Sequence, residues 1–293
     1  MRVSDQAIYG LANLRISRAR QESVDAGEQV SSGKKVEHPW DAAADSGLIV
    51  HHAQESARET AIQSAAQRSS EELVMADGAW DQVTTSLTRL KELATQMAND
   101  TYSAADRAGA ATEAQQLFGA IVSQANVRLG ERYLFGGTTD RTPPFDATGN
   151  YSGDANVRRV EIAPGVMNDA STRADVALKG AGGGVDVFAS IQNFITALST
   201  NNGANVRVAV QSMDDSLNQI TAERSRVGAM MNTFDVAATM AKQNLDAAKD
   251  ARASLEDVDI FEASTRLAAS QRALEASMSA AAQQFKLTLL DKL

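Results

Sequence analysis

The chain has 293 residues, of which 43% are hydrophobic and only 5% are aromatic, and it carries a formal net charge of −9. The acidic balance argues against a nucleic-acid partner, and the lack of cysteine excludes disulfides and thiolate metal sites. No apolar run reaches the roughly 18 residues of a membrane-spanning helix. The N-terminus has no continuous apolar stretch either, so we expect no cleaved secretory signal.

Glycine and proline are concentrated in the middle of the chain. Ten of the 19 glycines and three of the four prolines fall between Gly130 and Gly184, whereas residues 229–293 contain neither. Because these residues interrupt helices and mark turns, the pattern predicts helical arms on both sides of a turn-rich middle.

The N-terminal region offers two candidate sites, and we reject both. In GEQVSSGKK (residues 27–35), five residues separate the glycines where a phosphate-binding loop has four, and no strand precedes it. We interpret it as a polar turn between two helices. Neighbouring residues on a helix point about 100° apart, so His51 and His52 are poorly placed to chelate one ion. We predict no catalytic residue, no cofactor and no metal ion.

Both helical arms carry an apolar heptad repeat, over residues 62–97 and 206–255. The second segment would be roughly 75 Å long, more than the diameter of about 50 Å of a compact domain of this size, so we predict an elongated rod. Between the arms, Ser103 and Asp106 predict a capping box that starts a third helix. The rod-core seam is predicted to contain Leu73, Trp80, Leu87, Leu90, Met213, Leu217, Ile220, Met231, Phe234 and Leu245.

The middle of the chain has a strand-like composition. Residues 132–139, 156–165 and 173–180 are short, β-branched segments bounded by Pro or Gly, which predicts strands in a small β-rich insertion. Arg158 and Arg159 are interpreted as part of a solvated strand face. A glycine-rich linker, residues 181–188, is expected to lead into a short helix over residues 191–198.

The apolar repeat loses its phase at residues 255–259, where Asp257 could cap a new helix. It restarts at Ile260 and continues almost to the C-terminus, but Ser264 and Gln271 occupy positions of the stripe. A partly polar stripe is poorly suited to a permanent dry core. It is completed either by neighbouring subunits or by the chain's own N-terminal helix.

Four motifs, in order, resemble the flagellin-like hook–filament junction family of bacterial flagella. They are MRVS, EQVSSGKKVEHP, RYLFGGTTDRTPPF and LEDVDIFEASTRLAASQRALEAS…LTLLDKL. The family commonly has Ser-Asp-Asp-Pro after the lysine-containing turn, whereas this chain has Pro39-Trp40-Asp41. The resemblance implies a mainly α, flagellin-like rod in three parts: paired terminal helices (1–41 and 256–293) inside a tube, a helical rod (42–130 and 186–255), and a β-rich outer insertion (131–185).

The resemblance also implies a structural, non-enzymatic subunit outside the cell. Its expected partners are copies of itself in a ring, a hook-side junction protein, flagellin, and an export chaperone with the type III export apparatus. A short flagellin and a cytoplasmic signalling coiled coil are the alternatives. We predict that assembly contacts are made by Ile8, Leu11 and Leu14 near the N-terminus and by the stripe residues Ile260, Leu267, Leu274, Met278 and Phe285.

Overall fold

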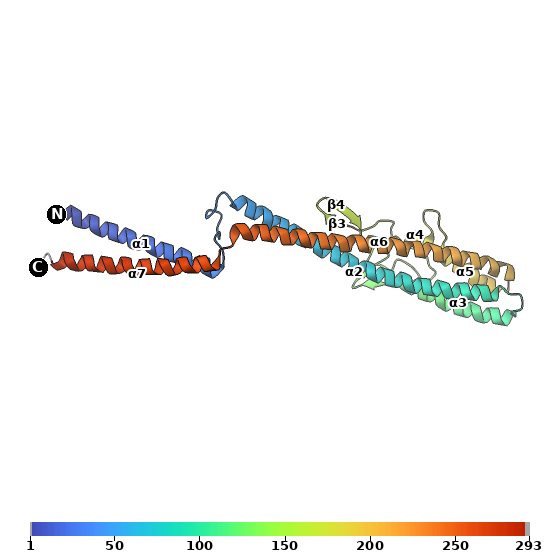
Figure 1. The fold of residues 1–293 in the computed structure, drawn as a ribbon. Helices are drawn as coiled ribbons and strands as arrows, with labels where there is room; N and C mark the ends of the chain where they lie inside the picture. The colour runs from blue at the N-terminus through green and yellow to red at the C-terminus, as the bar shows by residue number, and fades with distance from the viewer. Residues whose placement is uncertain (1, 291–293) are drawn as a thin grey trace. The chain divides into compact units, whose positions relative to one another are not determined.

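Seven α-helices and two small antiparallel sheets make up the described structure, so the predicted mainly α class is confirmed (Figure 1). It is a computed structural model that describes the backbone of residues 2–290 and the side chains of residue 7 and residues 9–283. The helices are α1 (Arg2–Ser32), α2 (Ser46–Met97), α3 (Ala104–Ala125), α4 (Ala174–Lys179), α5 (Val187–Ser199), α6 (Gly203–Glu256) and α7 (Ile260–Leu290). The strands are β1 (Arg128–Leu129), β2 (Arg132–Tyr133), β3 (Arg159–Ala163) and β4 (Val166–Asp169).

The chain divides into two compact units. The terminal unit contains Met1–Ala57 and Leu245–Leu293, and the central unit contains Arg58–Asn244. None of the described helices is both long enough and apolar enough to cross a membrane. The finer division into three parts, with boundaries near residues 41, 130, 185 and 255, stays a prediction.

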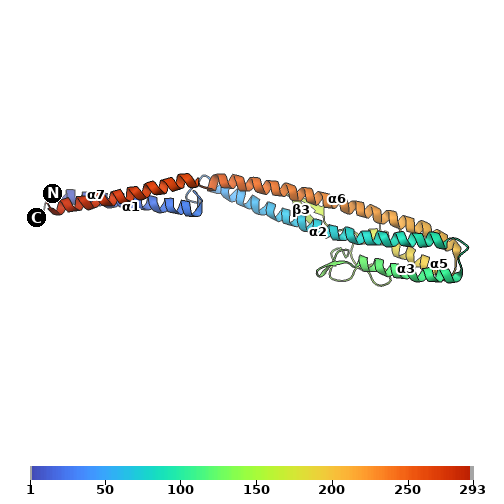
Figure 2. The same cartoon turned by 60° about the horizontal axis from the view of Figure 1, so that its bottom comes forward.

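In the central unit, α2 and α6 run antiparallel and lie side by side in both views (Figures 1 and 2). Arg224 Nε lies 3.0 Å from Asp77 Oδ1, and Lys91 Nζ lies 2.5 Å from Asp214 Oδ1. Of the residues assigned to the rod-core seam, the half-buried ones are Leu217 and Met231. The buried ones are Leu73, Trp80, Leu87, Leu90, Met213, Ile220, Phe234 and, within the terminal unit, Leu245.

A buried arginine holds the turns at one end of the central unit. Arg107 of α3 is 5% exposed. Its Nε donates to the carbonyl oxygen of Met97 at 3.2 Å, and its Nη1 donates to Asn201 Oδ1 at 2.6 Å. The same side chain therefore satisfies the last turn of α2 and the turn between α5 and α6. The predicted short helix is confirmed as α5, which packs against α3.

The predicted capping box at the start of α3 is confirmed. Ser103 Oγ accepts a hydrogen bond from the backbone N–H of Asp106, whose carboxylate accepts one from the backbone N–H of Ser103. Replacing Ser103 by Ala is expected to lower the free energy of unfolding by about 1 kcal/mol, because a helix N–H group loses its acceptor. Urea denaturation followed by circular dichroism measures the loss. Ser86→Ala, which removes a hydroxyl bonded only to a carbonyl of its own helix, should change little.

The insertion contains two separate two-stranded sheets, β1–β2 and β3–β4. Strands β3 and β4 form a hairpin through Gly165, whose φ of 75° lies in the left-handed region that favours glycine. The interpretation of Arg158 as part of a solvated face was wrong. Its guanidinium contacts the Glu72 carboxylate of α2, and Arg132 Nη2 lies 3.0 Å from the same carboxylate. These two ion pairs attach the insertion to α2.

The strand predicted over residues 173–180 was also wrong, because this segment contains helix α4. Alanine and leucine favour a helix, Asp175 lies in the first turn, and Lys179 lies in the last turn, where each charge suits the helix dipole. Gly180 ends the helix with a φ of 70°. The Gln219 side chain of α6 holds α4 in place, since its Nε2 donates to the carbonyl oxygen of Ala177 at 2.8 Å.

Candidate assembly surface

The terminal unit is built around α1 and α7, which pack along each other in opposite directions (Figures 1 and 2). The buried side chains of this pair, among those that the structure describes, are small. They are Ala19 and Ala26 on α1 and Ala263, Ser270 and Ala281 on α7. Small side chains let two helices approach closely but remove little apolar area from water. The pairing of terminal helices, which the resemblance implied, is confirmed, yet none of the described large apolar side chains on these helices is fully buried.

A buried carboxylate fixes the point where the two terminal helices meet. Glu256 is 8% exposed. Its Oε1 lies 2.5 Å from Lys34 Nζ, and its Oε2 lies 2.7 Å from Arg252 Nε. The backbone N–H of Lys35 donates to the Glu256 carbonyl oxygen at 2.8 Å, and that of Val258 donates to the carbonyl oxygen of Gly33 at 3.0 Å. The segment interpreted as a polar turn therefore also anchors the end of α6.

Asp259 caps α7, not Asp257 as predicted. Asp259 Oδ1 accepts hydrogen bonds from the backbone N–H groups of Phe261 and Glu262 at 2.8 and 3.2 Å. Asp257 instead forms a backbone bridge with Lys34. The two aspartates are equivalent as local capping signals, and only the pairing with the turn after α1 distinguishes them.

The ion pairs of Glu256 predict a pH-sensitive connection. Burial acts to raise the pKa of Glu256, but hydrogen bonds from Lys34 and Arg252 outweigh burial, so its pKa is lowered from the ordinary 4.5. A lowered pKa means that the folded state favours the carboxylate. This stabilisation is complete above the ordinary pKa and is lost as the pH falls through the lowered value.

We expect the backbone amides of Lys35 and Val258 to lose protection from hydrogen exchange as the pH falls below 4.5. Measured exchange rates, corrected for the intrinsic pH dependence, test this expectation. Glu256→Gln should reduce protection already at neutral pH and remove the additional pH dependence. The control Glu262→Gln breaks only the exposed pair with Arg266 and should leave these amides unchanged. Equal protection in wild type and Glu256→Gln at every pH would contradict the assignment.

Most described members of the predicted assembly set are exposed in the isolated chain. The exposed fractions are 57% for Leu11, 61% for Leu14, 51% for Ile260 and 55% for Met278. Leu267 and Leu274 are half-buried in the pair, and the side chains of Ile8 and Phe285 lie outside the described residues. The α1–α7 pair therefore does not cover all of its large apolar residues.

Two grooves lie along the α1–α7 pair. One, of about 430 Å³, is lined by Leu11, Ala12 and Arg15 of α1 and by the small residues Ala276, Ser277, Ala280 and Ala281 of α7. The other, of about 440 Å³, is lined by more polar residues, including Glu22, Asp25 and Arg266. The exposed leucine beside a shallow, small-residue groove is geometry that suits a helix of another subunit.

Two aromatic residues of the terminal unit that were not among the predicted assembly contacts are also exposed. Phe261, in the first turn of α7, is 84% exposed, and Trp40, in the loop between α1 and α2, is 75% exposed. The Trp40 ring stacks on His38 with ring centroids 4.5 Å apart. In the same loop, a hydrogen bond from the His38 backbone N–H is the main reason that the pKa of Asp41 is lowered. The departure from the family motif therefore lies in an ordered turn that presents an indole to solvent.

The two terminal helices lie in regions that match known protein families. The bacterial flagellin N-terminal helical region matches residues 3–140, and the bacterial flagellin C-terminal helical region matches residues 210–293. The chain belongs to the flagellin family. The two matches together span more than half of the chain and include both α1 and α7.

Within this family, the chain is similar over nearly its full length to flagellar hook-associated protein 3. It is 26% identical to that protein of Escherichia coli (strain K12) over 96% of each chain. It is also 26% identical to that of Salmonella typhimurium (strain LT2), over 94% of this chain and 95% of the relative. A solved structure from Vibrio parahaemolyticus shares the fold, with a TM-score of 0.68 and 23% identity over 74% of this chain and all of the other. The resemblance indicated by the sequence motifs is confirmed.

Proposed function

We propose that this chain is a structural subunit of the bacterial flagellum that joins the hook to the filament. Its terminal helices and helical rod pack laterally and axially against neighbouring subunits. The observation that carries the proposal is the α1–α7 pair, whose buried contacts are small residues while leucine, isoleucine and methionine side chains stay exposed. The similarity to flagellar hook-associated protein 3 over nearly the whole chain supports the same function.

We assign the predicted assembly residues to contacts between subunits. Burying a leucine or methionine side chain contributes about 1.5–3 kcal/mol, and several such contacts per subunit would be repeated around a ring. A closed ring makes head-to-tail contacts, in which each subunit presents two different surfaces to its neighbours. Leu11, which lines the groove on the α1–α7 pair, and the exposed Leu14 supply one such apolar surface. Further proposed partners are a hook-side junction protein on one side and flagellin on the other.

The same proposal includes the route by which the subunit is exported. We place the assembled protein outside the cell, in the flagellum, after export through the flagellar type III apparatus with the help of an export chaperone. The exposed apolar residues of the terminal helices would need protection before assembly, because large exposed apolar patches favour aggregation. A chaperone that covers this surface is therefore consistent with the proposed route.

Deletion of the gene provides the main test. Loss of a junction subunit should leave hooks without filaments and release flagellin monomers into the medium. Electron microscopy of the cells and immunoblotting of the medium measure the two outcomes. Normal filaments in the deletion strain would refute the junction function, and complementation with the wild-type chain serves as the control.

A short flagellin is the main alternative within the same family, because both flagellin helical regions match the chain. The copy number distinguishes the two functions. A filament subunit would dominate the protein content of sheared filaments, whereas a junction subunit would be a trace component. Quantitative mass spectrometry of sheared flagella therefore decides between them.

A further inference from the structure

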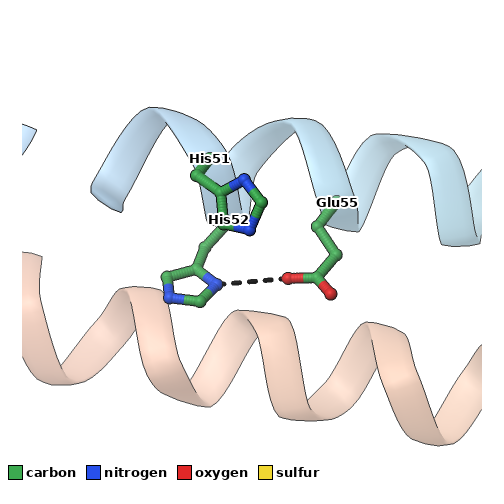
Figure 3. A group of neighbouring side chains, drawn as sticks. All are labelled: His51, His52 and Glu55. Carbon is green, nitrogen blue, oxygen red and sulfur yellow. Dashed lines mark hydrogen bonds and ion pairs between the residues drawn. The ribbon is translucent and has the colours of Figure 1, made fainter. Parts of the chain in front are cut away.

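Two histidines and a glutamate gather on one stretch of α2 in the terminal unit. Figure 3 shows His51, His52 and Glu55 projecting from neighbouring turns, with the His52 ring directed toward the Glu55 carboxylate. His52 Nδ1 lies 3.2 Å from Glu55 Oε2, and the two imidazole centroids are 5.4 Å apart. One ligand atom of each side chain can be chosen so that all three lie within 4.8 Å of one another.

The spacing along the helix explains why the three groups meet. Glu55 is four residues after His51 and three after His52, and residues three or four apart are neighbours on a helix surface. The two adjacent histidines alone are poorly placed to chelate one ion, because their Cα–Cβ bonds diverge. Glu55 lies within reach of both imidazoles, so the carboxylate closes a triangle that two adjacent histidines cannot form alone.

We propose that His51, His52 and Glu55 form a binding site for Zn²⁺ or a similar divalent transition-metal ion. Two imidazole nitrogens and one carboxylate oxygen are a donor set that zinc binds in proteins, with bonds of about 2.0–2.2 Å. In a tetrahedral site with such bonds, the ligand atoms are about 3.4 Å apart. The distance between His52 and Glu55 already approaches this value, so His51 makes the main adjustment.

The surroundings of the three side chains permit this adjustment. His51 and Glu55 are exposed and His52 is half-buried, so rotation of the His51 ring needs no repacking of the helix. Three protein ligands leave the fourth tetrahedral position for a water molecule or an outside group. The ion would connect successive turns near the start of α2, and binding only the folded state would stabilise these turns.

Isothermal titration calorimetry of the full, untagged chain with Zn²⁺ alone tests the site. We expect one ion bound per chain in the wild type. Each of His51→Ala, His52→Ala and Glu55→Gln should weaken the affinity at least about tenfold, because even groups that only support a metal ligand have effects of this size. The matched control is His38→Ala, which removes the chain's one other histidine, located in the loop before α2. It should leave the affinity unchanged.

Amide hydrogen exchange supplies a second measurement that does not depend on the calorimetric signal. Saturating Zn²⁺ should slow exchange over residues 46–57 in the wild type and not in Glu55→Gln, whose circular dichroism should match the wild type. Absence of stoichiometric zinc binding would overturn the proposal. Binding that survives all three substitutions, or that does not depend on His51, would overturn the three-ligand site. The hook–filament function does not depend on any of these results.

Discussion

Replacing Leu14 by Asp is expected to prevent incorporation of the subunit into the flagellum while leaving the isolated chain folded. Leu14 is 61% exposed on α1, so a charged side chain at this position can stay hydrated in the isolated chain. In the proposed assembly the same side chain is buried against a neighbour. The variant then loses about 1.5–3 kcal/mol of apolar burial at each contact and must also bury an unpaired carboxylate, which costs several kcal/mol more.

The measurement is complementation of the deletion strain. Cells that produce Leu14→Asp should have hooks without filaments and flagellin in the medium, although the purified variant keeps the circular dichroism spectrum of the wild type. Met278→Asp, at a 55% exposed position on α7, should give the same result. Leu274 is less informative, because it is half-buried in the pair and its replacement would also disturb α1 against α7.

A matched control is available in the insertion. Val166 at the start of β4 is 49% exposed, so Val166→Asp introduces the same charge at an apolar position that is only slightly less exposed than Met278. We expect normal filaments with this variant, because the insertion is proposed to face the solvent in the assembly. Normal filaments with Leu14→Asp and Met278→Asp as well would contradict the proposed role of the terminal helices.

The long helices could be predicted from the sequence because their signal is repeated many times. The heptad pattern of residues 62–97 and 206–255 lies within α2 and α6, and the capping box at Ser103 has the predicted hydrogen bonds. A regular apolar period identifies both the helix and its buried face, since the same spacing produces both. Leu11 and Leu14 were selected differently, because the family resemblance implied that the N-terminal helix pairs with the C-terminal one.

Short elements and long-range partners could not be predicted in this way. Residues 174–179 are too few to show a helical period, so the flanking glycine and the β-branched valine suggested a strand. The contact between Arg158 and Glu72 joins residues 86 positions apart, and no local pattern encodes it. Phe261 lies outside the apolar repeat that restarts at Ile260, so the sequence pattern does not indicate whether its ring is exposed or buried.

Replacing Trp80 by Ala is expected to lower the free energy of unfolding by about 3–5 kcal/mol, the usual loss when a large aromatic side chain is removed from a core. Trp80 is fully buried, and its ring centroid lies 4.4 Å from that of Phe135. The side chain thus connects the rod-core seam with the segment after β2. Since urea lowers the free energy of unfolding by at most about 3 kcal/mol per molar, the transition midpoint should fall by at least roughly 1 M.

Two further variants test whether the loss of stability comes from the buried packing of Trp80. Trp80 Nε1 is buried without a hydrogen-bond partner among the described residues, so Trp80→Phe gives up no such bond while keeping an aromatic ring against Phe135. It should therefore lose less than half as much stability as Trp80→Ala. The chain's second tryptophan, Trp40, is 75% exposed, and Trp40→Ala should leave the urea midpoint almost unchanged. Equal losses for Trp80→Ala and Trp40→Ala would show that the buried contacts of Trp80 do not stabilise the central unit.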